Sequence, residues 1–149
     1  MYRKRYKNKN IKIMKTLYTT QATAKGGRNG KVETADGVLS VEVRMPKELG
    51  GVGEGYTNPE QLFAAGYSAC FDSALNLVAQ QAKQKITSKV TAEISLGAVE
   101  GGFGLGAALF VEIEGVEREV AQGLMEAAHK VCPYSKAINN NVDVKLTLV

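Results

Sequence analysis

A long apolar segment occupies the middle of the sequence and begins with NPEQLFAAGYSACF at Asn58. Asn58 is suited to cap a helix, Pro59 suits the first helical position, and Glu60 is favourable in the first turn. We therefore expect a helix that runs from Asn58 to about Lys83 or Lys85, where the sequence becomes polar. Its small and apolar residues cover nearly all sides, so it needs packing partners all round.

Alternation of apolar and polar residues predicts strands on both sides of this helix. An Asn-Gly pair in KGGRNG (25–30) suits a tight reversal between two of them. A second helix is expected from about Glu117 to Cys132, where Pro133 ends it, and a short further helix at 134–139. About six strands are predicted, and the clearest alternation falls at 15–24, 41–45, 90–98, 105–113 and 142–148.

The order of these elements is three strands, a long helix, two strands, a helix and a strand. This order predicts an α+β domain with an antiparallel sheet. A sheet of this size covers only one side of the long helix. We therefore expect an obligate homodimer in which two such helices pack centrally, with residues 14–149 forming a single domain.

Residues 1–13 differ from the rest of the chain in charge. They hold six of the 19 basic residues and no acidic residue, so 14–149 carries 13 basic and 15 acidic side chains. The excess of positive charge therefore belongs to the extension, which argues against a nucleic-acid or membrane partner for the domain. We expect a disordered tail at 1–13, with a nucleic-acid-binding arm or a targeting peptide as alternatives.

The apolar segments do not suggest secretion or membrane insertion. No apolar stretch of suitable length follows the N-terminal charges, as a secretory signal would require. The long apolar segment contains Asp72 and Asn76, so it is interpreted as a buried core helix and not as a membrane span. A cytoplasmic location is expected.

Cys70 and Cys132 are the only cysteines. They could be separate buried thiols, or a pair that cycles between dithiol and disulfide. Burial in an apolar helix would raise the pKa of the Cys70 thiol, so reactivity requires a nearby cation. Arg28, in the GGRNG turn, is the best candidate, and Glu60 could hold it. Glu60 lies about 15 Å from Cys70 along the helix, so it would act through Arg28 or from a second subunit.

Other chemistries find less support in the sequence. GGVGEG (50–55) lacks the ending of a phosphate-binding loop, and GFGLGA (102–107) opens a strand where a dinucleotide fingerprint opens a helix. A zinc site from His129, Cys132 and Cys70 lacks a second pair of close ligands, so no metal is expected. A hydrolase with His129 as base to Cys70 remains a minor alternative.

Two cysteine-centred motifs resemble those of the OsmC/Ohr superfamily. They are TNPEQLFAAGYSACF (57–71) and CPYSKA (132–137), and the GGRNG turn precedes them. The resemblance extends from about Met14 to Val149. Within the superfamily, PEQLFAAGY and CPYS look most like the organic hydroperoxide resistance (Ohr) branch.

The resemblance implies an intertwined α+β homodimer with two long central helices and active sites at the interface. It implies that Cys70 is the peroxidatic cysteine and Cys132 the resolving cysteine. Arg28 would stabilise the thiolate, and Glu60 would be its carboxylate partner. The implied enzyme is a cysteine-based peroxidase that reduces alkyl or fatty-acid hydroperoxides to alcohols, through a Cys70 sulfenic acid and a Cys70–Cys132 disulfide.

The resemblance also implies the reductant. It is a dithiol, a lipoyl group (dihydrolipoamide) on a partner protein, and no bound cofactor is expected. Apolar surroundings would select an organic hydroperoxide over hydrogen peroxide. Two alternatives stay open, an OsmC-branch peroxidase with a broader substrate range and a non-enzymatic binding protein whose cysteines never pair. Candidates for the substrate pocket wall, each of which could equally be core, are Phe63, Tyr67, Phe71 and Tyr134.

Overall fold

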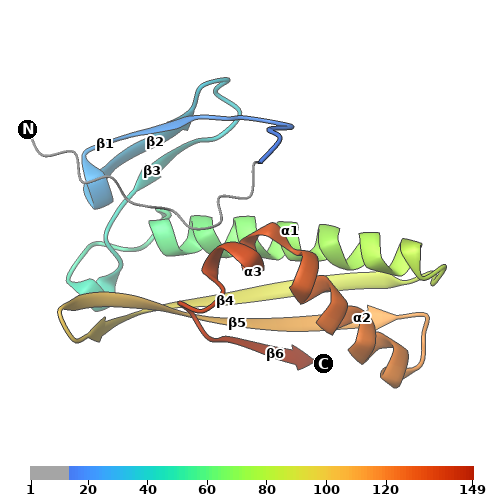
Figure 1. Ribbon diagram of the computed structural model, residues 1–149. Coiled ribbons are helices and arrows are strands. Elements are labelled where there is room, and N and C mark those ends of the chain that lie inside the picture. The colour runs from blue at the N-terminus through green and yellow to red at the C-terminus, as the bar shows by residue number, and fades with distance from the viewer. Residues whose placement is uncertain (1–13) are drawn as a thin grey trace, which may run out of the picture.

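Two three-stranded sheets and the helices packed against them make up residues 14–149, the part of the chain that the computed structural model describes (Figure 1). The basic tail expected at 1–13 lies outside the described residues. The elements, with η marking short 3₁₀ helices, are β1 (Ala22–Lys25), η1 (Gly27–Asn29), β2 (Gly30–Thr34), β3 (Ser40–Val43), η2 (Lys47–Leu49), α1 (Pro59–Gln81), β4 (Thr87–Val99), β5 (Gly102–Glu114), α2 (Arg118–Val131), α3 (Pro133–Ile138) and β6 (Val144–Leu148).

Helix α1 begins as the sequence predicts. The Asn58 side chain accepts a hydrogen bond from the Gln61 backbone N–H at 2.8 Å, and Pro59 occupies the first turn. The helix ends at Gln81, slightly before the expected end. Lys83 adopts a φ of 55°, in the left-handed region, and so cannot continue a right-handed helix.

The N-terminal sheet is antiparallel, in the order β1-β2-β3. Figure 1 shows this sheet on one side of α1 and the second sheet on the other. The strand predicted at 15–24 is shorter in the structure and begins only at Ala22. The partner strand β2 ends at Thr34, opposite Ala22, so earlier residues have no neighbouring strand with which to pair.

The second sheet, in the order β4-β5-β6, corrects one part of the prediction. Strands β4 and β5 form a long antiparallel hairpin, as expected, but β6 pairs with β5 in parallel. Helices α2 and α3 lie between β5 and β6 in the chain and return it to the starting end of β5, and such a crossover produces a parallel pair. The α+β class and the six strands are confirmed.

The hydrophobic core lies between the second sheet and the helices, where α1 packs on β4 and α2 packs on α1. Among the described residues, α1 is the one helix long and apolar enough to cross a membrane by length and composition alone. Here one face of α1 packs into the core, and its opposite face includes exposed Ala65, Ala69, Ser73 and Leu77. The buried side chains of α1 are Tyr67, Phe71, Ala74, Leu75, Val78 and Ala79.

Candidate active site

The two cysteines, far apart in sequence, meet in the fold. The Cys132 thiol donates a hydrogen bond to the sulfur of Cys70, with the two sulfur atoms 3.8 Å apart. Cys132 is fully buried, whereas Cys70 is partly exposed, and both are free thiols. Because a disulfide bond is about 2 Å long, a small movement would suffice to join them. The arrangement favours the redox pair over two separate buried thiols.

Local sequence places Cys132 where it faces α1. Pro133 occupies the first position of α3, so α2 ends at Val131 and Cys132 lies between the two helices with an extended ψ of 122°. The first N–H groups of a helix have no partner within the helix. One of them, the backbone N–H of Tyr134, lies close enough to the Cys70 sulfur to lower the pKa of that thiol. Sequence reasoning missed this donor, although Pro133 was a signal that a helix begins there.

The surroundings of Cys70 hold its pKa above the usual value. Burial is the largest cause, the Tyr134 N–H acts in the opposite direction, and the neighbouring Cys132 raises the pKa further. Burial penalises the charged thiolate more than the neutral thiol. A reactive Cys70 therefore needs additional positive charge close to its sulfur.

Arg28 and Glu60 form a second pair, as the sequence predicts. Arg28 lies in η1, and Gly26 and Gly27 on its N-terminal side have φ values of 85° and 57° that favour glycine. Two guanidinium nitrogens bond the two carboxylate oxygens at 2.5 and 2.8 Å. This bidentate contact raises the pKa of Arg28 and lowers that of Glu60. The result is a fixed, charged guanidinium at the start of α1.

The two pairs are separate in the single protomer. Across residues 14–149, no hydrogen bond or ion pair joins Arg28 or Glu60 to either thiol. Glu60 belongs to the first turn of α1, and Cys70 follows about 15 Å further along the same helix. Contact between the guanidinium and the thiolate therefore requires movement of the η1 turn, or Arg28 from a second subunit.

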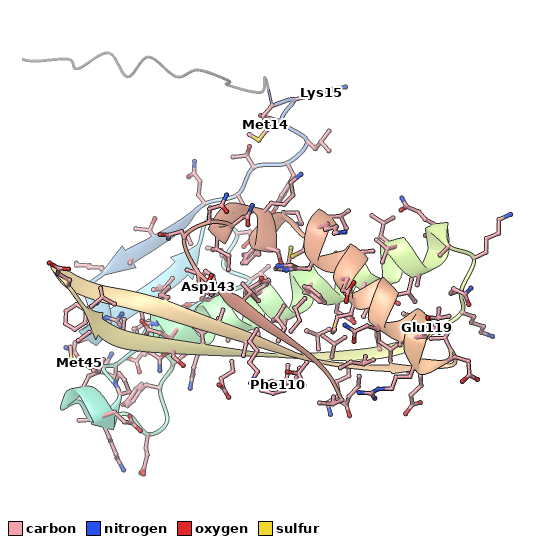
Figure 2. All side chains as sticks on the ribbon, turned by 60° about the horizontal axis from the view of Figure 1, so that its bottom comes forward. Met14, Lys15, Met45, Phe110, Glu119 and Asp143 are labelled. Carbon is pink, nitrogen blue, oxygen red and sulfur yellow. The ribbon has the colours of Figure 1, made fainter. Side chains whose placement is uncertain are left out.

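Arg28 borders an apolar cavity that the sequence did not reveal. The cavity has a volume of about 330 Å³ and is lined by Arg28, Met45, Leu49, Leu96 and Phe103. Figure 2 labels Met45 where η2 approaches the tip of the β4–β5 hairpin. A sequence signal for this cavity was available in Phe103, an aromatic residue in the Gly-rich EGGFGLG turn, where polar residues are usual. In the structure Phe103 is 78% exposed at the rim of the cavity. A second cavity, of about 460 Å³, shares Leu49 and Leu96 and is lined by Glu60.

Three of the four predicted wall residues form an aromatic cluster next to Cys70. Phe63, Tyr67 and Tyr134 have ring centroids 5.9–6.0 Å apart. Gly66 allows this approach, because a Cβ there would lie 2.9 Å from the Tyr134 hydroxyl oxygen. Phe71 and Tyr67 are both fully buried in the hydrophobic core, so both have a packing role, and Tyr67 also supports the ring cluster from the core side.

His129 is not placed to act as the base of a hydrolase. Its Nδ1 lies 2.9 Å from the Ser135 hydroxyl, and burial lowers its pKa. No hydrogen bond joins His129 to Cys70 within the described part of the chain, which argues against the Cys-His alternative. No group of three or more His, Cys, Asp or Glu side chains there could hold a metal ion.

The ion pair should make stability depend on pH in a defined direction. Arg28 lowers the pKa of Glu60 below its usual 4.5, so the stabilisation is present above that value and is lost as pH falls through the folded-state pKa. We expect Glu60→Gln to unfold more easily than the wild type at about pH 7, with the difference vanishing in acid. Urea unfolding at several pH values measures this, and a pH-independent difference would contradict it.

The fold and the paired thiols together define an α+β protein with a candidate redox dithiol at the junction of three helices. Residues 51–147 match the model of the family described as OsmC-like protein. The chain belongs to this family, as the sequence motifs predict.

Its relatives include organic hydroperoxide resistance proteins. One, from Xanthomonas axonopodis pv. citri (strain 306), is 46% identical over 136 residues, which cover 90% of this chain and 96% of that protein. A crystal structure of an organic hydroperoxide resistance protein from Elizabethkingia anophelis is 59% identical with a TM-score of 0.86, covering 91% of this chain and 98% of that one. A crystal structure of an organic hydroperoxide resistance protein from Legionella pneumophila is 55% identical with a TM-score of 0.86, covering 90% of this chain and 98% of that one. The Ohr resemblance is thus confirmed.

Proposed function

We propose that the protein is a cysteine-based peroxidase that reduces organic hydroperoxides to alcohols. The observation that carries this proposal is the pair of reduced thiols 3.8 Å apart, one partly exposed and one fully buried. A peroxidatic cysteine must be reached by substrate, and a resolving cysteine must lie beside it. The names of the relatives, organic hydroperoxide resistance proteins, support the same role.

In the proposed reaction, the Cys70 thiolate attacks one oxygen of ROOH and the O–O bond breaks. The alkoxide leaves, takes up a proton and becomes the alcohol, and Cys70 becomes a sulfenic acid. The Cys132 sulfur then attacks the Cys70 sulfur, and the hydroxyl leaves as water with the Cys132 proton. An external dithiol reopens the disulfide by thiol–disulfide exchange.

Arg28 is proposed to stabilise the Cys70 thiolate, with Glu60 holding the guanidinium in place. The raised pKa of Cys70 supports the need for such a cation. A homodimer with two long central helices is proposed as well. It would cover the small exposed side chains on α1 and could supply Arg28 to the thiol of its partner.

Once Arg28 is brought to Cys70 as proposed above, the apolar cavity beside Arg28 is proposed to receive the organic part of the substrate. Phe63 and Tyr134 would form a further wall beside Cys70, with buried Tyr67 behind them. A hydrocarbon chain gains free energy on leaving water, whereas hydrogen peroxide has no carbon to bury. The proposed reductant is a lipoyl group on a partner protein, and the proposed location is the cytoplasm.

The test is peroxide consumption by the purified protein with dihydrolipoamide as reductant. We expect kcat/KM for tert-butyl hydroperoxide to exceed that for hydrogen peroxide by about 100-fold, since each buried carbon is worth about 0.8 kcal/mol. Cys70→Ser is the blank and should show no turnover. Comparable rates for the two peroxides would favour the OsmC-branch alternative. No turnover, with both thiols still titratable after peroxide treatment, would favour a binding protein.

A further inference from the structure

One buried hydroxyl joins the three helices that surround the thiol pair. Ser135 of α3 is 3% exposed, and its Oγ lies 2.7 Å from the Tyr67 hydroxyl of α1 and 2.9 Å from Nδ1 of His129 on α2. We call these three residues the hydroxyl clamp. Burial lowers the pKa of His129, which favours the neutral ring. With Nδ1 as acceptor, Tyr67 donates to Ser135 and Ser135 donates to His129, which satisfies both contacts.

Each member of the hydroxyl clamp lies about one helical turn from a thiol on the same chain segment. Tyr67 precedes Cys70 by three residues, His129 precedes Cys132 by three, and Ser135 follows Cys132 by three. Ser135 also follows Tyr134, whose backbone N–H lowers the pKa of Cys70. The clamp therefore joins the segment carrying Cys132 to the helix carrying Cys70.

Apart from the contact between the two thiols, few side-chain hydrogen bonds fix this segment among the described residues. Helix α3 has only six residues, Pro133 has no N–H, and no side chain caps its N-terminus. In the described range, the two contacts of Ser135 are the side-chain hydrogen bonds that link α3 to α1 and α2. The Tyr134 ring and Ile138 also pack α3 against its neighbours, but such apolar contacts are not directional. The clamp therefore supplies the directional contacts that fix the position of this short helix.

We propose that Ser135 is a positioning residue that holds Cys132 against Cys70, so that disulfide formation outruns over-oxidation. The inference rests on the proposed peroxidase function. The Cys70 sulfenic acid has two fates. With the Cys132 thiol it forms the disulfide and releases water. With a second ROOH it becomes sulfinic acid and releases ROH. Only the first fate depends on where Cys132 lies.

The readout is the ratio of sulfinic acid to disulfide at Cys70, measured by mass spectrometry over a series of tert-butyl hydroperoxide concentrations. This ratio is independent of the rate of the first oxidation, because both products arise from the same sulfenic acid. For Ser135→Ala we expect the ratio at a given peroxide concentration to rise about tenfold, as one buried and one part-buried hydrogen bond are lost. Ser135→Thr, which keeps the hydroxyl, should restore most of the wild-type ratio.

Ser88 offers a matched control. Its Oγ donates to Asp72 at 2.6 Å and accepts from Asn76 at 2.9 Å, so it also joins two elements, β4 and α1, by two hydrogen bonds. Ser88→Ala also loses two hydrogen bonds, one part-buried and one exposed, at another site and should keep the wild-type ratio. If Ser88→Ala raised the ratio as much as Ser135→Ala, general loosening of the fold would explain the result and the inference would be wrong.

A second variant covers the case in which Ser135→Ala does not fold. His129→Leu removes the bond on the α2 side, next to a polar cavity of about 260 Å³ that also borders Asp143 (labelled in Figure 2). It should raise the ratio about threefold. A wild-type ratio in the folded variants would overturn the inference alone. Absence of any disulfide in the oxidised wild type would overturn the proposed function as well.

Discussion

An Arg28→Ala variant is expected to react with tert-butyl hydroperoxide about 100-fold more slowly than the wild type at neutral pH. Burial already raises the pKa of the Cys70 thiol. An adjacent cation lowers a thiol pKa by about one to three units, and each unit changes the thiolate fraction about tenfold when the thiol is mostly protonated. Without the guanidinium the reactive thiolate would therefore be scarce.

The measurement is the rate of Cys70 oxidation by stopped flow across a range of pH. The midpoint of this profile gives the thiol pKa, which should move upward in Arg28→Ala. The oxidation rate and thiol pKa of Arg28→Lys should fall between those of the wild type and Arg28→Ala. Lysine keeps the positive charge but lacks the guanidinium group that binds Glu60 through two nitrogens. Arg118→Ala is the control, as Arg118 bonds only the Leu148 carbonyl among the described residues. A full rate with an unchanged thiol pKa in Arg28→Ala would show the electrostatic account to be wrong.

A Cys132→Ser variant is expected to lose at least about 99% of sustained turnover while still consuming the first equivalent of hydroperoxide. Cys70 can be oxidised without Cys132, but its sulfenic acid then has no thiol 3.8 Å away with which to condense. Further hydroperoxide would carry it to the sulfinic acid, which external dithiols do not reduce. The enzyme would inactivate itself as it worked.

Intact-protein mass spectrometry after successive equivalents of hydroperoxide measures this outcome. The wild type should lose two hydrogens as the disulfide forms, whereas Cys132→Ser should gain two oxygens. Cys70→Ser serves as the control, and it should neither gain these oxygens nor form the intramolecular disulfide. Sustained turnover of Cys132→Ser without oxygen gain would mean that the external dithiol reduces the sulfenic acid directly, and the resolving role of Cys132 would be wrong.

Local signals predicted much of the fold. The capping sequence at Asn58 placed the start of α1, and Pro133 placed the break between α2 and α3. The strand predicted at 15–24 was too long, since a strand ends where its neighbour ends and alternation cannot show this. The parallel pairing of β6 with β5 was missed for a similar reason. Strand direction follows from the path of the chain through α2 and α3.

By itself, the sequence determined the residue types of the site and the elements that carry them, because capping, periodicity and proline geometry act over a few neighbouring residues. It also suggested that Arg28 pairs with Glu60, since a buried guanidinium needs an anion. Only the tertiary structure decided which thiol is buried and how far apart the sulfur atoms lie. It alone brought Ser135 between Tyr67 and His129, because packing sets contacts between residues distant in sequence.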